Sequence, residues 1–210
     1  MHKMEGMSTQ PIKISFKEQM HQARERAILQ AACDLLGAKS FDAMTMDDVA
    51  NGVGIAKASL YKHFGSKEDL CCAAMVEVLH LVRAFLATLD SDLPAVDKLR
   101  AVVRWSLERL LAHEMPLLPS RNSTLRGVLM SNKDYADGVI LLSDSLGEWI
   151  VQAQAEGVIE PSLPPLVVLY TLYARACDPV VGFLKESELY PDDEIIELVL
   201  RTCFDGLSAR

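Results

Sequence analysis

Residues 45–64, TMDDVANGVGIAKASLYKHF, decide the fold of this chain. Thr45 and Asp48 have the spacing of a capping box, in which each side chain accepts a hydrogen bond from a backbone amide that a helix start leaves free. Two glycines, the second of them Gly54, then end this helix and allow a tight turn. A shorter helical segment follows the turn. This order of helix, glycine turn and short helix predicts a helix-turn-helix over 45–64.

The second helix of this pair has the side chains that a DNA-reading helix needs. The first residues of this helix have small or short side chains, so that the backbone can approach base edges in the major groove. Hydrogen-bond donors for phosphate groups surround them. The residues expected at this interface are Lys57, Ala58, Ser59, Tyr61, Lys62 and His63. On the pattern alone, a surface helix pair within an ordinary helical bundle fits the same residues.

The rest of the chain shows helical periodicity and no β-alternation of useful length, so the sequence predicts an all-α protein. Besides the helix-turn-helix, helices are expected at 16–36, 67–89, 94–113, 120–130, 133–156, 164–185 and 191–207, with a kink at Pro179. The chain is expected to divide into a flexible N-terminal tail at 1–15, a DNA-binding domain at 16–66 and a helical effector-binding and dimerisation domain at 67–210.

The charge is distributed unevenly along the 210 residues. The net charge of -8 falls on residues 71–210, because residues 1–70 hold equal numbers of basic and acidic side chains. Salt screens the repulsion between the acidic part and phosphate beyond about 10 Å. The acidic composition therefore leaves DNA binding by the first part of the chain possible.

Several protein classes are not expected from this sequence. The longest uncharged apolar stretch, 161–174, contains three prolines and is shorter than the ~20 residues that span a bilayer, so no membrane partner is expected. Residues 1–10 have no apolar core like that of a secretory signal, which predicts a cytoplasmic protein. The five cysteines show neither a disulfide framework nor a repeated metal-ligand spacing.

An enzyme is not expected either. The sequence contains no glycine-rich phosphate loop, no HExxH pair and no nucleophile elbow. Its histidines show no ligand pattern; they are His2, His21, His63, His80 and His113. We therefore expect no catalytic residues, no metal and no cofactor.

A longer string of residues, from Arg26 to Leu70, carries a more specific pattern. It consists of Phe41, the Thr45–Ala50 stretch, Gly54-Ile55-Ala56-Lys57, Leu60-Tyr61-x-His63-Phe64 and Lys67-Glu68-x-Leu70. This string resembles the N-terminal domain of the tetracycline-repressor (TetR) family of bacterial regulators, over about the first third of the chain. The resemblance implies a three-helix DNA-binding head, a long fourth helix, and a larger helical body that dimerises and usually holds a small-molecule pocket.

The resemblance also implies roles for individual residues. Phosphate contacts would come from Thr45, Tyr61, His63 and Lys67, and the base-edge or close-approach contacts from Lys57, Ala58 and Ser59. Two of these residues also have plainer interpretations: Tyr61 as a ring that covers the core, and Lys67 as a solvated charge at a helix start.

The sequence departs from the family pattern at the recognition helix. Ala56 stands where the family usually has Ser or Thr, so this helix is expected to lack its side-chain cap. Ala58 and Ser59 take positions often held by Gly and Thr, which alters sequence preference in an unknown direction.

In the rear domain, bulky and cationic side chains suggest an effector pocket. The residues expected to bind the ligand are Trp105, Arg109, Leu125, Met130, Trp149 and Tyr173. Most such side chains at helical spacing serve packing, so this set is a hypothesis. Arg175 lies in an apolar helix near Asp178, where it either pairs with that carboxylate or meets an acidic effector or a partner subunit.

The last two predicted helices favour a homodimer. The segment 164–176 is apolar on almost all sides and the last helix has an apolar stripe, which one chain cannot easily cover. We expect a two-fold interface of four helices, 164–185 and 191–207 from each subunit, as the family resemblance also implies. Packing of both helices inside a monomer is the alternative.

These observations predict a repressor that binds a palindromic double-stranded DNA operator as a dimer and that a small-molecule effector releases. The alternative is a thiol- or metal-responsive regulator that uses Cys71 and Cys72. Adjacent helical residues point ~100° apart, which suits packing better than a disulfide between these two cysteines.

Overall fold

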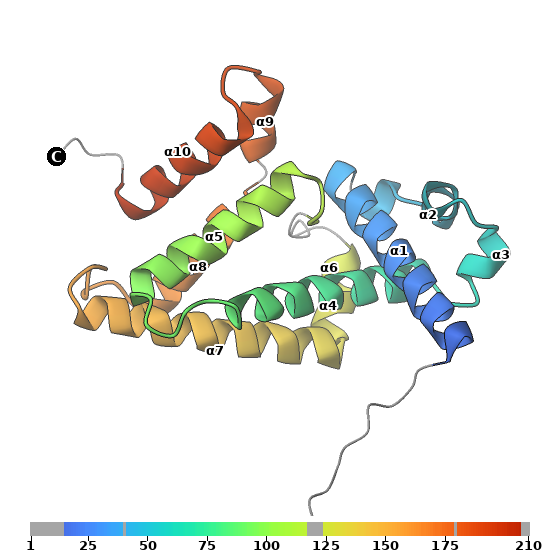
Figure 1. Cartoon of the computed structure of the whole chain (residues 1–210), viewed down its shortest axis with the longest axis horizontal. Coiled ribbons are helices and arrows are strands. Elements are labelled where there is room, and N and C mark those ends of the chain that lie inside the picture. Colours follow the sequence, from blue (N-terminus) through green and yellow to red (C-terminus); the bar gives the residue numbers. More distant parts are fainter. Residues whose placement is uncertain (1–14, 40, 117–123, 179, 207–210) are drawn as a thin grey trace, which may run out of the picture.

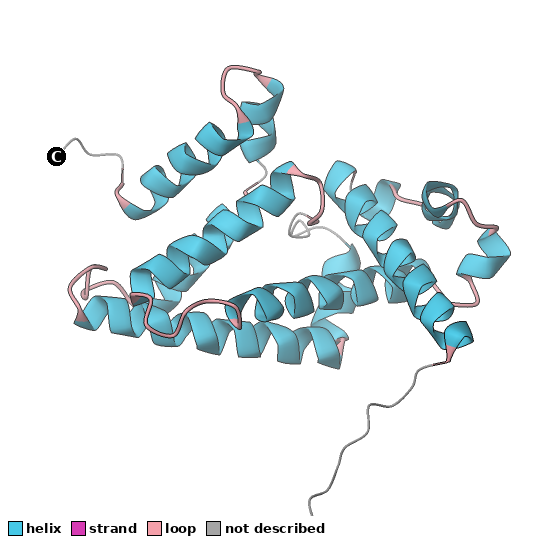
Figure 2. Ribbon diagram, viewed as in Figure 1, coloured by secondary structure: helices cyan, strands magenta, loops and turns pink. Residues whose placement is uncertain are grey.

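The structure, a computed structural model, describes residues 15–39, 41–116, 124–178 and 180–206. All regular secondary structure within these ranges is helical (Figure 2). The helices are α1 (Phe16–Ala38), the 3-10 helix η1 (Phe41–Ala43), α2 (Met46–Val53), α3 (Lys57–Leu60), α4 (Lys67–Leu86), α5 (Ala95–Leu111), α6 (Thr124–Ser131), α7 (Lys133–Ala155), α8 (Pro165–Ala176), α9 (Val180–Glu186) and α10 (Asp192–Phe204). The predicted all-α fold is confirmed. Residues 1–14 of the expected N-terminal tail lie outside the described residues.

Side-chain caps fix where several helices begin. The capping box predicted for α2 is confirmed: the Asp48 amide donates to Thr45 Oγ1 over 3.1 Å, and the Thr45 amide donates to Asp48 Oδ2 over 2.9 Å. Ser15, Ser66 and Asn132 accept from backbone amides at the starts of α1, α4 and α7. Each cap satisfies an amide that would otherwise lack a partner.

Two predicted helices differ from those observed. The helix expected to reach Phe64 is only four residues long, and the chain continues through a turn. The predicted helix 164–185 is divided into α8 and α9 rather than kinked. Residue 178 precedes a proline, which disfavours helical backbone angles there, and the Asp178 carboxylate instead accepts from the Val180 amide over 2.9 Å. Pro179 itself lies outside the described residues.

The helices form two groups, which two further helices connect (Figure 1). We call α1, η1, α2 and α3 the head, and α5, α7, α8, α9 and α10 the body. The long helix α4 packs on α1 in the head and on α7 in the body. The short helix α6 packs on η1, α4 and α7, and its Thr124 hydroxyl donates to Asp42 of the head over 2.8 Å. The head is therefore joined to the body through both α4 and α6.

Each group has its own buried core, and α4 contributes to both. Leu70, Cys71 and Met75 of α4 are buried in the head core, whereas Leu79 and Val82, further along the same helix, are buried in the body core. Helix α4 is therefore packed into both cores.

Helices α8 and α10 use their apolar residues differently. The stripe of α10 is buried inside the subunit, on Ile195, Ile196, Val199 and Leu200. This differs from the expectation that one chain cannot easily cover it, because α10 packs against α5, α8 and α9. In contrast, α8 and α9 leave large apolar side chains exposed, namely Leu166, Val167, Tyr170, Val180 and Phe183.

Candidate nucleic-acid interface and effector cavity

Helix α3 lies at the end of the head that is furthest from the body (Figure 1). Leu60 is fully buried and Phe64 is nearly so, and these two side chains anchor α3 and the following turn to the head core. Lys57 and Ala58 are exposed and Ser59 is half-buried. The short side chains at the leading end of α3 therefore face outward, as an approach to base edges requires.

The entry to α3 lacks a side-chain cap, as expected from Ala56. Gly54 closes α2 in the left-handed conformation, with φ 73°, which glycine adopts at no steric cost. Ala56 then has extended backbone angles, and no side-chain hydrogen bond satisfies the first amides of α3.

Lys57 is paired within the head. Its ammonium donates to Asp47 Oδ2 of α2 over 2.7 Å, and this hydrogen bond raises the pKa of Lys57. The pair is solvent-exposed, and such pairs contribute little to stability. Lys57 can therefore exchange Asp47 for a base edge or a phosphate at small cost.

The Lys67 side chain links the start of α4 to the segment between α1 and α2. Its ammonium donates to the carbonyl oxygens of Phe41 (3.0 Å) and Met44 (3.1 Å), and it lies 4.2 Å from the centroid of the Phe41 ring. Two of its three donors are thus used at the start of α4. The predicted phosphate contact would have to use the third.

Thr45, Tyr61 and Lys62, which are also expected to contact phosphates, are accessible from solvent. Tyr61 is 46% exposed, and Lys62, the next residue, is also exposed. The hydroxyl of Thr45 accepts the capping hydrogen bond, which leaves its proton available to an oxygen acceptor.

His63 is turned inward, toward α1. Its ring centroid lies 4.4 Å from that of His21, and its Nδ1 is buried with no hydrogen-bond partner. Burial, together with the charge on His21, lowers the pKa of His63. Glu25, one helical turn after His21, lies beside both rings. The expectation that the histidines form no ligand pattern stays a prediction, but the structure brings His21 and His63 together beside Glu25, and the i, i+4 spacing of His21 and Glu25 was the signal for part of this cluster.

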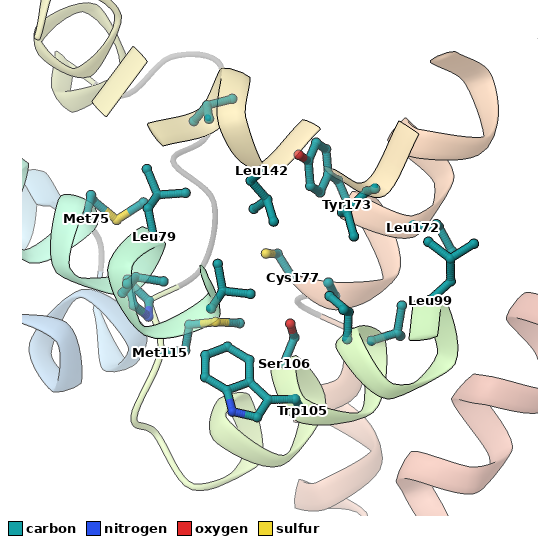
Figure 3. Close-up of a pocket in the computed structure, with 18 of the residues that line it drawn as sticks. Met75, Leu79, Leu99, Trp105, Ser106, Met115, Leu142, Leu172, Tyr173 and Cys177 are labelled. Carbon is teal, nitrogen blue, oxygen red and sulfur yellow. The ribbon is translucent and has the colours of Figure 1, made fainter. Parts of the chain in front are cut away.

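The body encloses a cavity of about 150 Å³ between α4, α5, α7 and α8 (Figure 3). Aliphatic and aromatic side chains form most of its wall. Those contributed by α4 and α5 include Met75, Leu79, Leu99, Val103 and Trp105, and those from α7 and α8 include Leu142, Leu172 and Tyr173. Among the described residues that line it, none carries a charged side chain.

The few polar groups of this cavity are neutral. The Ser106 hydroxyl and the Cys177 thiol point into it (Figure 3), and Ser106 is only 4% exposed to solvent. Burial raises the pKa of the Cys177 thiol to about 12 and also raises the pKa of Tyr135 and Tyr173. The Tyr173 hydroxyl is hydrogen-bonded to Ser143 over 3.0 Å. At neutral pH these four groups offer hydrogen bonds but no charge.

Of the six residues that were expected to bind the ligand, only two line the cavity. Trp105 and Tyr173 line the cavity. Arg109 lies over the Trp105 ring, 4.7 Å from its centroid, and pairs with Glu114. The others lie elsewhere: Leu125 in the head core, Met130 on the surface at 65% exposed, and Trp149 against the body core. The cavity residues of α4, such as Met75 and Leu79, were not identified from the sequence, because their spacing is that of ordinary core positions.

Arg175 pairs with Asp178, one of the two alternatives considered for it. Its guanidinium donates to Asp178 Oδ2 over 2.9 Å. Arg175 and Asp178 line a hollow together with Tyr170 rather than the apolar cavity.

Comparison with known proteins agrees with this arrangement. Residues 28–74 match the model of the family described as bacterial regulatory proteins, tetR family. The HTH-type transcriptional regulator RutR of Escherichia coli K12 is 29% identical over 205 residues, which cover 90% of this chain and 92% of RutR.

Two similar solved structures share the whole fold. The structure of AibR in complex with isovaleryl coenzyme A and operator DNA has a TM-score of 0.63 at 21% identity, covering 88% of this chain and 100% of that one. The structure of FadR from Bacillus subtilis in complex with stearoyl-CoA has a TM-score of 0.61 at 16% identity, covering 87% and 99%. At these identities the likeness shows the fold.

Proposed function

Because the chain belongs to the tetR family of bacterial regulatory proteins and is a DNA-binding transcriptional regulator rather than an enzyme, we propose that it is an effector-released repressor. In this proposal a homodimer binds a roughly palindromic operator through the helix-turn-helix at 45–64, and a small molecule in the body cavity releases it. We retain the domains at 16–66 and 67–210 as part of the proposal.

A single observation carries the effector-controlled mechanism: α4 is both a wall of the cavity and a part of the head core. Met75 belongs to the head core and also lines the cavity, between Leu70 on the head side and Leu79 on the cavity side. Packed cores resist compression, so a molecule that enters the cavity displaces α4 and, with it, the head. The effector must bind the displaced state more tightly by a few kcal/mol to empty the operator.

The cavity wall indicates the class of effector. A charged group would lose its hydration there without gaining a partner, so the buried part of the effector is expected to be uncharged and mainly apolar. A cavity of about 150 Å³ is the size of one that holds benzene. The isovaleryl and stearoyl coenzyme A complexes of AibR and FadR support an acyl group as the buried part. The small volume favours a short or branched chain over a long one.

The exposed apolar face of α8 and α9 supports the dimer. Leu166, Val167 and Tyr170 on α8 and Val180 and Phe183 on α9 are each more than half exposed, and a patch of this kind on a monomer typically marks an interaction site. We propose that this face, at 164–185, forms most of the contact, with 191–207 beside it. Such a dimer presents two heads to half-sites ~34–36 Å apart.

The same segment has a second interpretation by composition. Pro165–Glu186 is long and apolar enough to cross a membrane, and 29% of its most apolar stretch is buried. The structure divides it between α8 and α9, with the Arg175–Asp178 ion pair close to the division. Light scattering after gel filtration without detergent distinguishes the two: a dimer that Phe183→Glu converts to monomer supports the proposal, and loss of the wild type to aggregation without detergent contradicts it.

DNA binding is tested by fluorescence anisotropy on DNA from upstream of the protein's own gene, across a salt series. Lys62→Ala is expected to weaken binding and to reduce the salt slope by about 1, because one phosphate contact is lost. The matched control is Lys133→Ala in the body, whose lysine is also exposed and should leave the slope unchanged. Selection from random DNA follows if that fragment does not bind; failure of both would overturn the proposal.

The effector site is tested by filling it. Ser106→Phe places a ring in the cavity and is expected to weaken binding of short acyl compounds, followed by quenching of Trp105 emission. Arg175→Met is the control, because Arg175 lies outside the cavity and should leave that affinity unchanged. Equal losses in both variants would contradict the assignment of this cavity.

The alternative of a thiol sensor at Cys71 and Cys72 is disfavoured by their surroundings. Both are buried, and burial raises the pKa of Cys71 to about 12 and also raises that of Cys72. The protonated thiol is a poor nucleophile and metal ligand. A DNA-release response to oxidant that disappears in the Cys71→Ser, Cys72→Ser double variant would restore this alternative.

A further inference from the structure

Three side chains with metal-ligating groups meet in the head, away from the residues that line the cavity. They are His21 and Glu25 of α1 and His63 of the turn after α3, and one ligand atom from each lies within 4.8 Å of the other two. We propose that they form a site for a divalent transition metal of the zinc class, which ties the start of α1 to the end of the helix-turn-helix.

The local geometry brings these groups together from two elements. His21 and Glu25 are four residues apart on α1, so their side chains share one face of the helix, and His21 Nδ1 lies 3.6 Å from Glu25 Oε2. His63 approaches the same face from the turn, with its ring centroid 4.4 Å from that of His21. An ion between the three would therefore link segments that are far apart in the sequence.

The strongest sign of a missing partner is at His63. Its Nδ1 is buried and makes no hydrogen bond within the described part of the chain. Buried polar atoms are nearly always satisfied, and each exception calls for an unseen water or ion or for a functional reason. His63 offers one of its two ring nitrogens to the cluster, and an ion bound at Nδ1 would remove the exception.

The donor set selects the kind of metal. Two imidazole nitrogens and one carboxylate oxygen are ligands of Zn²⁺ and similar ions, with a fourth position left to water. Calcium and magnesium prefer oxygen ligands throughout. Ligands at about 2.0–2.1 Å from one ion lie about 3.4 Å apart in a tetrahedron. The ligand atoms now lie within 4.8 Å of one another, so they must close in by up to about 1.4 Å. The His21 and Glu25 side chains are 58% and 42% exposed and are free to do so.

The charges around the site permit a cation. The positive charge of Arg24 acts on His63 and would repel a metal ion. The negative charge of Glu25, which belongs to the ligand set, would offset this repulsion. A hollow at the start of α1, lined in part by Ser15, His21 and His63, leaves the site open to solvent. Metal can therefore enter and leave without unfolding the head.

The position of His63 links the site to DNA binding. It lies between Lys62, an expected phosphate contact, and Phe64, which is buried in the head core. A bound ion would fix this turn and add positive charge beside the phosphate contacts, so operator affinity is expected to rise with metal. This consequence rests on the proposed DNA-binding function, whereas the metal site does not.

The site is tested with Co²⁺ as a spectroscopic probe, on full-length protein without an affinity tag and after removal of metals by chelation. One Co²⁺ per chain is expected, with a visible absorption band that Zn²⁺ displaces. His21→Ala, on an exposed side chain, should weaken binding at least about tenfold, the effect of losing even a group that only supports a ligand. His63→Gln should do the same.

The matched control is His80→Ala on α4. His80 lies 3.6 Å from Glu77, the distance that separates His21 from Glu25, but no second histidine is described beside that pair. Co²⁺ affinity should be unchanged in this variant. No binding by the wild type, or equal binding by His21→Ala and His80→Ala, would overturn the site.

Anisotropy with and without Zn²⁺ then tests the link to DNA. Tighter operator binding with Zn²⁺, absent in His21→Ala, supports the link, and an unchanged affinity in a protein that binds Co²⁺ overturns it. Because the Co²⁺ titration needs no operator, failure of the DNA-binding proposal would not be mistaken for failure of the metal site.

Discussion

The head and the body use their buried residues for different purposes. In the head core, Ile28, Val49, Leu60 and, from α4, Leu70 are fully buried and pack together. In the body, residues of the same kind surround a cavity of about 150 Å³. The head is thus packed to hold one shape, whereas the body keeps a space that a second molecule can fill. Since α4 belongs to both cores, substitutions near its head end should mainly lower the free energy of unfolding. Substitutions near its cavity end should mainly alter effector affinity.

The largest effect is expected from Leu60→Ala in the head. Leu60 is fully buried, and truncation leaves a cavity that costs about 2–5 kcal/mol. Urea unfolding should show this loss, and operator binding should fall because Leu60 anchors α3. Leu81→Ala on α4 is the control, since Leu81 is 37% exposed and should lose far less. Equal losses would contradict a tightly packed head.

A smaller loss of stability, together with a change in effector affinity, is expected from Gly138→Ala on α7. A Cβ at this position would lie 2.9 Å from Leu79 Cδ1 of α4, which is too close. Leu79 lines the cavity, and the atom in contact is the end of its flexible side chain. The side chain must therefore shift toward the cavity, at a cost near the low end of about 1–3 kcal/mol. We expect a lower melting temperature together with altered effector affinity.

Gly147→Ala, on the same helix, is the matched control. Nothing lies within 4 Å of a Cβ at that position, and alanine in a helix is favoured over glycine by about 0.5–1 kcal/mol. It should therefore stabilise the protein and leave effector affinity unchanged. Destabilisation by both variants would show that α7 as a whole, rather than its contact with α4, is sensitive.

The difference between head and body also explains what the sequence could predict. The head is specified by local rules: Thr45 and Asp48 predict the capping box, Gly54 the turn, and Ala56 the uncapped α3, and all three are confirmed. Such features depend on residues a few positions apart, so spacing alone is informative.

The cavity could not be predicted in this way. Trp105 and Tyr173 line it, but so do Leu79 and Ser106, which look like ordinary helix positions. Which residues face an internal space depends on how four helices pack against one another, and helical periodicity gives only the buried face of each. The same reason explains why the proximity of His21 and His63 was missed, because it arises from packing between α1 and a distant turn.

At the head, Thr45→Ala should have an effect of about 1 kcal/mol. The variant removes the acceptor for the Asp48 amide at the start of α2, and loss of such a cap costs about 0.5–2 kcal/mol. Thermal unfolding followed by circular dichroism measures the loss. Thr171→Ala on α8 is the control, because its hydroxyl bonds only a carbonyl within its own helix. If both variants melt alike, the cap does not stabilise the head.

The same cap gives the head a dependence on acid. Lys39 and the Thr45 amide hydrogen-bond to Asp48, and they lower the pKa of its carboxyl from 3.8 to about 2. A lowered carboxyl pKa contributes stability above the unfolded-state pKa, and this contribution is lost as the pH falls from about 4 to about 2. Asp48→Asn should therefore melt below the wild type at pH 7, with the difference shrinking as the pH falls through that window. A difference that is constant with pH would contradict the role of the carboxylate.

The smallest expected effect has the opposite sign and lies in the uncapped helix. Ala56 already has the extended backbone of an N-cap residue, with φ -67° and ψ 140°, so Ala56→Ser can accept from the amides of α3 without rearrangement. We expect a gain of up to about 1 kcal/mol in unfolding free energy, whereas Ala58→Ser, inside the same helix, should give none. The gain would order α3 before DNA arrives and raise operator affinity, because less conformational entropy is then lost on binding. A gain in stability without a gain in affinity would mean that α3 is already ordered in the free protein, and that its four residues are held by Leu60 rather than by their first turn.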